Sequence, residues 1–93
     1  QAIATYVEAL KLEPDSARSR RDLGLALLRA NRPQEAIEHL EAAQKLEQTA
    51  EGFTYLADAY IAAGDRDAAA RQRSLAQQLI LQIKLARIRE LAR

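Results

Sequence analysis

The sequence predicts an all-α fold built from stacked helix pairs, and three observations lead to this prediction. Ala, Leu, Arg, Glu and Lys supply 56 of the 93 residues, a composition typical of helical repeats and long helices. The β-branched residues Val, Ile and Thr number only 10, too few to build a sheet. The chain also repeats itself at offsets of 33 and 34 residues, with apolar residues at three- and four-residue steps.

Turn-forming and capping residues divide the chain into five expected helices, near residues 1–13, 16–30, 33–47, 50–63 and 66–92. Pro14 ends the first helix, and Asp15 and Ser16 offer side-chain oxygens that can cap the second. Asn31 tolerates the left-handed backbone that follows a helix, and Pro33 suits the first turn of the next one.

The same signals recur further along the chain. Thr49 is a suitable cap for the fourth helix, while Gly64 closes it and Asp65 caps the fifth. From Ala68 onward there is no Gly or Pro, so a single helix of about 25 residues is expected.

The repetition is seen in one short motif and in two longer units. The short motif reads Ala2-Ile3-x-x-Tyr6-x-x-Ala9-Leu10-x-Leu12-x-Pro14. A full unit runs from Leu23-Gly24 to Leu46, and another from Leu56 to Leu79 with Phe53 one turn before it. These residues resemble the tetratricopeptide repeat, a helix pair of about 34 residues. The sequence departs from the family pattern at Arg20, Gln48, Ala57 and Arg73.

The resemblance implies a right-handed α-solenoid of antiparallel helix pairs, with about two and a half repeats and a long C-terminal helix. We expect one domain over residues 1–93. Its parts are the second helix of a partial repeat, two repeats, and an extension of the last helix or a capping helix: residues 1–15, 16–48, 49–79 and 80–93. Because the chain contains no Met and opens at Gln1 inside a second helix, we expect a fragment of a larger protein.

One face of the first helix in each repeat is expected to line the concave groove, the usual binding surface of helical arrays. Helical periodicity gives the packing side as Leu23, Gly24, Leu27, Ala30, Phe53, Leu56, Ala59 and Tyr60. The opposite side is the candidate partner-binding groove, with Arg18, Arg21, Asp22, Leu25, Leu28, Arg29, Glu51, Thr54, Asp58 and Ile61.

The groove residues favour a protein or peptide partner. Leu25, Leu28 and Ile61 offer apolar contacts, between arginines on one helix and two acidic residues on the other. Such a groove suits an extended or helical peptide with apolar anchors between an acidic and a basic end. Under the alternative interpretation, a neighbouring helix covers the aliphatic residues or they are simply exposed, and the charges form a solvated face or internal ion pairs.

Apolar residues near both ends are candidates for self-association: Ile3, Tyr6, Leu10, Leu81, Leu85, Ile88 and Leu91. The first three lack a first helix to pack against and are expected to form an exposed stripe. The last four lie on a broad arc of the final helix. A homodimer, docking of another protein, or packing within the array as a closing helix or part of a following repeat all fit that arc.

The composition argues against an enzyme. There is no Cys and one His, so thiol chemistry and a transition-metal cluster are both unsupported, and no metal or cofactor is expected. Three Gly residues spread over the chain do not make a phosphate loop. His39 is expected to point away from the packing side, without a group that orients it as a base. No apolar run is long enough to span a membrane.

Two alternative functions remain open at this point. The basic residues of the last helix could contact nucleic acid, although the net charge of +1 gives the chain no overall field to attract it: Arg66, Arg71, Arg73, Lys84, Arg87, Arg89 and Arg93. The chain could also be an interaction appendage of an enzyme encoded elsewhere on the parent chain. The sequence leaves the compartment open, and its high Arg-to-Lys ratio is compatible with a bacterial protein of the cytoplasm or periplasm.

Overall fold

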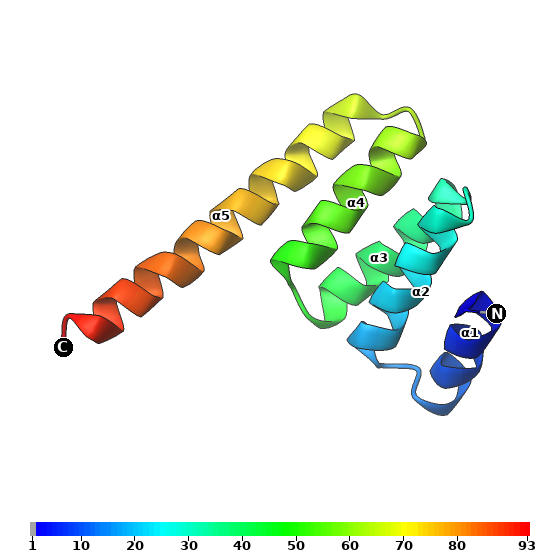
Figure 1. Ribbon diagram of the computed structural model, residues 1–93, viewed down its shortest axis with the longest axis horizontal. Coiled ribbons are helices and arrows are strands. Elements are labelled where there is room, and N and C mark those ends of the chain that lie inside the picture. The colour runs from blue at the N-terminus through cyan, green and yellow to red at the C-terminus, as the bar shows by residue number, and fades with distance from the viewer. Residues whose placement is uncertain (1) are drawn as a thin grey trace.

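The computed structural model describes residues 2–93, which form five α-helices (Figure 1). They are α1 (Ala2–Leu12), α2 (Ala17–Arg29), α3 (Pro33–Leu46), α4 (Ala50–Ala62) and α5 (Arg66–Leu91). Each described helix end lies within one residue of its predicted bound, while Gln1 lies outside the described residues. Residues 2–93 contain no strand, so the all-α prediction is confirmed.

Three predicted N-caps are confirmed by side-chain hydrogen bonds. Ser16 Oγ accepts from the Ser19 backbone N–H at 3.1 Å, and Thr49 Oγ1 accepts from the Gly52 N–H at 2.9 Å. The carboxylate of Asp65 accepts from the Ala68 N–H at 3.0 Å. Each bond satisfies a donor at a helix start that has no partner within the helix.

Left-handed residues end α2 and α4, as the sequence predicts. Asn31 has φ of 63° and Gly64 has φ of 86°. The reversal brings the next N–H back onto the helix, so that Arg32 donates to the Leu27 carbonyl and Asp65 donates to the Tyr60 carbonyl, both at 2.9 Å. Carbonyls at the helix ends thereby find donors.

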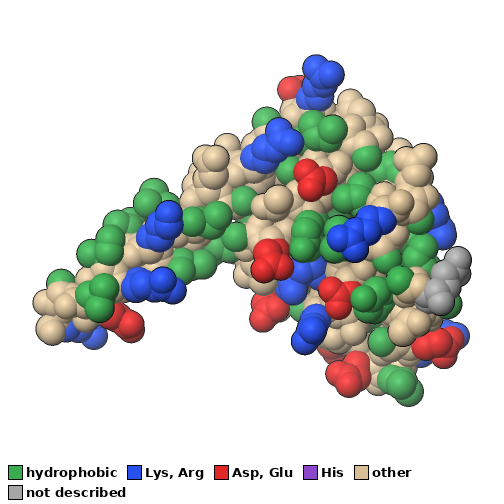
Figure 2. Space-filling model, viewed as in Figure 1, with side chains coloured by type: hydrophobic (Ala, Val, Ile, Leu, Met, Phe, Trp, Pro, Cys, Tyr) green, Lys and Arg blue, Asp and Glu red, His purple; other side chains and the backbone are tan. Residues whose placement is uncertain are grey.

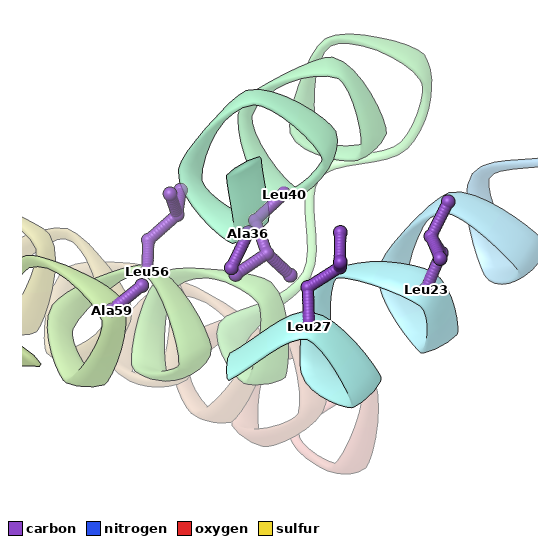
Figure 3. Close-up of a cluster of buried hydrophobic side chains, with 6 residues drawn as sticks. All are labelled: Leu23, Leu27, Ala36, Leu40, Leu56 and Ala59. Carbon is purple, nitrogen blue, oxygen red and sulfur yellow. The ribbon is translucent and has the colours of Figure 1, made fainter. Parts of the chain in front are cut away.

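The core lies in the angle between three helices. Side chains of α3 point between those of α2 and α4, as Figure 3 shows. The six buried residues of this cluster are Leu23, Leu27, Ala36, Leu40, Leu56 and Ala59. The alanines leave room for close helix contact, while the leucines fill the seam between the helices.

One predicted packing residue is an exception. Ala30, placed on the packing side by periodicity, is exposed. It is the C-cap of α2, where the chain already turns toward α3 and the regular helical direction no longer applies.

The helices are arranged as a row of antiparallel neighbours, with the two chain ends at opposite ends of the molecule (Figure 1). The first half of α5 packs on α4 through Ala68, Ala69 and Ala76. Beyond Leu79 every residue of α5 is exposed, and the helix projects from the body. None of the helices formed by residues 2–93 is long and apolar enough to cross a membrane.

Candidate protein-binding surface

The predicted groove residues lie on α2 and α4, which run in the same general direction (Figure 1). On α4 the four predicted residues are all exposed: Glu51, Thr54, Asp58 and Ile61. On α2, Arg18 and Arg29 are exposed, whereas the others are partly buried: Arg21, Asp22, Leu25 and Leu28. Figure 2 shows acidic side chains over α4, with charges of both signs and apolar side chains nearby over α2.

A hollow of about 360 Å³ lies between α1 and α2. It brings together Asp22, Leu25 and Arg29 of the predicted groove with Ile3 and Tyr6, which the sequence assigned to a separate surface. Its walls are mainly apolar, and one acid and one base stand in the lining. We call this feature the α1–α2 hollow.

The repeat geometry explains the hollow. The helix α4 packs against two preceding helices, α2 and α3, whereas α2 packs against one preceding helix, α1. Ala59 of α4 is fully buried, but Ala26, its counterpart 33 residues earlier, is only partly buried and lines the hollow. Sequence reasoning missed Ala26 as a lining residue, although its alignment with Ala59 is the signal that identifies it.

Two predicted groove residues serve the fold. Leu28 is partly buried and packs against the core cluster. The side chain of Arg21 is only 13% exposed, and its Nη2 donates to Glu47 Oε1 at 3.1 Å. This pair ties α2 to the segment that follows α3. Neither side chain therefore projects freely toward a partner.

The remaining charged residues of the predicted groove lie in two places, one basic and one acidic. Arg18 lies 3.9 Å from Asp22 in a long, exposed contact between side chains one turn apart, which contributes little energy. Within residues 2–93, Arg29 at the hollow and Glu51 and Asp58 on α4 make no ion pair. These three charges are available to a partner. The hydroxyl of Thr54 instead donates to the Ala50 carbonyl at 3.0 Å.

A family model described as tetratricopeptide repeat matches residues 1–51, more than half of the chain. The chain belongs to the tetratricopeptide repeat family. A search of curated proteins finds no match. Tetratricopeptide repeats generally mediate protein–protein interaction and are typically non-catalytic. In the structure α2 packs against α3, and α4 packs against α5, as two helix pairs.

The residues assigned to self-association behave differently at the two ends of the array. Ile3, Tyr6 and Leu10 are partly buried and pack against the core cluster, so they do not form the exposed stripe that was expected. Packing of α2 on α1 accounts for this difference. The four residues of α5 are exposed at between 44 and 82%: Leu81, Leu85, Ile88 and Leu91.

The one histidine of the tetratricopeptide repeat chain is partly buried, although the sequence suggested that it points away from the packing side. His39 Nδ1 is sealed from solvent and makes no hydrogen bond. Burial, followed by repulsion from Arg20, lowers the pKa of His39 below its usual value. Residues 2–93 contain no group of three or more His, Cys, Asp or Glu side chains that could hold a metal ion.

The basic residues proposed for nucleic-acid contact are all exposed, along α5 and just after its end: Arg66, Arg71, Arg73, Lys84, Arg87, Arg89 and Arg93. They lie on several sides of the helix, and α5 carries no aromatic residue for base stacking. The aromatic residues lie elsewhere, as with Tyr60, whose hydroxyl donates to Glu41 Oε2 at 3.1 Å. Family membership favours a protein partner and adds nothing for nucleic acid.

Proposed function

We propose that this tetratricopeptide repeat chain is a non-catalytic interaction module that binds a helical or extended segment of a partner protein. The segment lies in the α1–α2 hollow and continues over the exposed face of α2 and α4. The observation that carries the proposal is the hollow itself. Preceding helices cover Ala59 of α4 on two sides, whereas the equivalent side of Ala26 opens into a space lined by apolar side chains.

The lining chemistry specifies the segment. Ile3, Tyr6 and Leu25 favour a large apolar side chain, because burying it removes apolar surface from water on both partners. Arg29 favours an acidic residue near that anchor, and Glu51 and Asp58 favour basic residues further along. The complementary segment therefore has an acidic end, an apolar middle and a basic end.

Selection of peptides from a random displayed library against the immobilised chain tests the proposal. Selected peptides should share the acidic, apolar and basic order. Ala26→Leu fills the hollow and should weaken their binding about tenfold or more, a loss of about 1.4 kcal/mol. The matched control is Ala70→Leu on the exposed surface of α5, which should change affinity less than twofold.

Two charge-reversal variants provide an independent test. Arg29→Glu should weaken binding and shift selection away from acidic residues, while Arg66→Glu, an equal charge change at the start of α5, should leave both unchanged. Circular dichroism checks that each variant stays folded. The proposal would be overturned if the peptides bound the Ala26→Leu and Arg29→Glu variants as tightly as they bind the parent chain.

A further inference from the structure

Residues 80–93, which are the last part of α5 and the two residues after it, project from the body, and every one of them is exposed (Figure 1). We call these residues the arm. Figure 2 shows apolar side chains along the arm, interspersed with basic ones. Leu81, Leu85 and Ile88 follow one another at steps of four and three residues, which is the spacing of a coiled-coil seam. The arm thus presents a continuous apolar stripe to solvent.

The packing of α4 on α3 shows which side of α5 is suited to receive another helix. Two hydrogen bonds join this side of α3 to α4. The Tyr60 hydroxyl of α4 donates to Glu41 at 3.1 Å, and the Gln44 side chain donates to the carbonyl of Thr49, the N-cap of α4, at 3.0 Å. The 33-residue offset carries these two positions of α3 to Ser74 and Gln77 of α5, which are exposed.

Continuing along α5 at helical spacing from Gln77 leads to Leu81 and Ile88 on the same side. The stripe therefore lies on the side of α5 that corresponds to the helix-covered side of α3. In residues 2–93 no helix covers it.

Basic residues flank the stripe. Lys84 precedes Leu85 and Arg89 follows Ile88, at the two positions that border a coiled-coil seam. The arm contains four basic residues and one acidic residue, Glu90, which lies on the side away from the stripe. None of these five makes an ion pair within the described chain. The flanks are therefore positive and unneutralised.

We infer that the arm docks an amphipathic helix of a partner protein whose apolar stripe is bordered by Glu or Asp side chains. The apolar stripes pack together, and the partner's carboxylates pair with Lys84 and Arg89. This surface is separate from the α1–α2 hollow, so the two can be tested independently.

A second copy of the chain matches the arm poorly. Parallel pairing sets Lys84 against Arg89 of the other copy, and antiparallel pairing also offers no carboxylate to either residue. An anionic lipid surface is a poorer match too, because a helix lying on a membrane has one apolar and one polar face. Ile83, which is 51% exposed, places an apolar side chain beside Glu90 on the side opposite the stripe, so that side is not uniformly polar.

The test uses the full chain and two synthetic peptides of three heptads, both with Ile at a and Leu at d. One peptide carries Glu at the e and g positions, and the other carries Lys. Fluorescence anisotropy should show at least tenfold tighter binding of the Glu peptide, and raising the salt from about 0.05 M to about 0.5 M should weaken it. Equal binding of both peptides, or binding of neither, would overturn the inference.

Variants identify the docking surface. Leu85→Ala and Ile88→Ala should each weaken the Glu peptide about tenfold, whereas the matched control Ile83→Ala on the opposite side should change affinity less than twofold. Reversing both flanks with Lys84→Glu and Arg89→Glu should transfer preference to the Lys peptide. All these side chains are exposed, so the fold should persist.

Two further measurements separate the competing occupants. Sedimentation of the chain alone should show a monomer, and vesicles of phosphatidylcholine with phosphatidylserine should not retain it. A dimer that Leu85→Ala abolishes would assign the stripe to a second copy. Retention on the vesicles that Leu85→Ala abolishes would assign it to a lipid surface. Either result would overturn the inference.

Discussion

The helix α3 and the arm of α5 have similar aliphatic residues at helical spacing, but their surroundings differ completely. Leu40 of α3 is fully buried between α2 and α4, whereas Leu85 of the arm is 44% exposed. Neighbouring helices, rather than residue type, decide this difference. The same apolar residue stabilises the fold where a helix covers it, and remains available to a partner where none does.

The largest expected effect separates these two regions directly. Leu40→Ala removes a fully buried side chain and leaves a cavity, so it should lower the free energy of unfolding by about 2–5 kcal/mol. Ile88→Ala in the arm should change it by less than about 0.5 kcal/mol, because Ile88 is exposed. Urea denaturation followed by circular dichroism measures both.

Leu40→Val gives a milder version if the Ala variant does not fold. A cost at Ile88 that matches the cost at Leu40 would mean that the arm is buried in solution. That result would abolish the contrast between the two regions.

The second effect concerns how closely α2 approaches α3. A Cβ atom built on Gly24 would lie 2.5 Å from Leu40 Cγ, closer than carbon atoms pack. Because Leu40 is fully buried, Gly24→Ala should destabilise the fold by about 1–3 kcal/mol from overpacking. The better helix propensity of Ala offsets about 0.5–1 kcal/mol of that cost.

A double-mutant cycle identifies the cause. In the Leu40→Ala background the clash is gone, so Gly24→Ala should become neutral or stabilising. An unchanged cost in that background would show that contact with Leu40 is not the reason for Gly at this position.

Local signals explain why the helix ends were predictable from the sequence. Ser16, Thr49 and Asp65 cap helices with their own side chains, and Asn31 and Gly64 supply the left-handed backbone, so each boundary depends on residues within a few positions of it. Repetition at 33 and 34 residues supplied the pairing of the helices.

The candidate site was less predictable, because it depends on contacts between helices. Helical periodicity placed Arg21 and Leu28 on the open face. In the structure Arg21 pairs with Glu47, and Leu28 packs against the core cluster. Ile3 and Tyr6 are distant in sequence from Leu25, and only the packing of α1 on α2 brings them to one hollow. Periodicity gives a direction around one helix and does not identify what lies there.

The third prediction concerns a network of hydrogen bonds that joins α3 to α4 and has no counterpart in the arm. Thr49 caps α4, and its backbone and hydroxyl are also held by the Gln44 side chain. Thr49→Ala should lower the free energy of unfolding by about 1 kcal/mol. Thr54→Ala is the matched control, because the Thr54 hydroxyl is exposed and bonds only within its own helix. Equal losses at both positions would argue against the cap.

The smallest effect is the pH dependence that His39 gives to the packed region. Burial and the positive charge of Arg20 on α2 lower the pKa of His39, while Glu38 and Glu35 on α3 partly oppose that shift. In the unfolded chain the imidazole returns to its ordinary pKa near 6.5 and binds a proton more readily. Folding stability should therefore fall as the pH drops below that value, and level off once the folded state is protonated too.

Thermal unfolding of the chain between about pH 7.5 and pH 5 measures this dependence, and the His39→Gln variant removes it while leaving the titration of the carboxylates in place. The chain has one histidine, so its imidazole resonance reports the pKa directly. Arg20→Gln removes the nearby charge and should raise that pKa. If the variant and the parent chain lose stability equally over this range, the titration of carboxylates accounts for the whole dependence. In that case the pKa of His39 is the same in the folded and the unfolded chain, and the packed region does not perturb the imidazole.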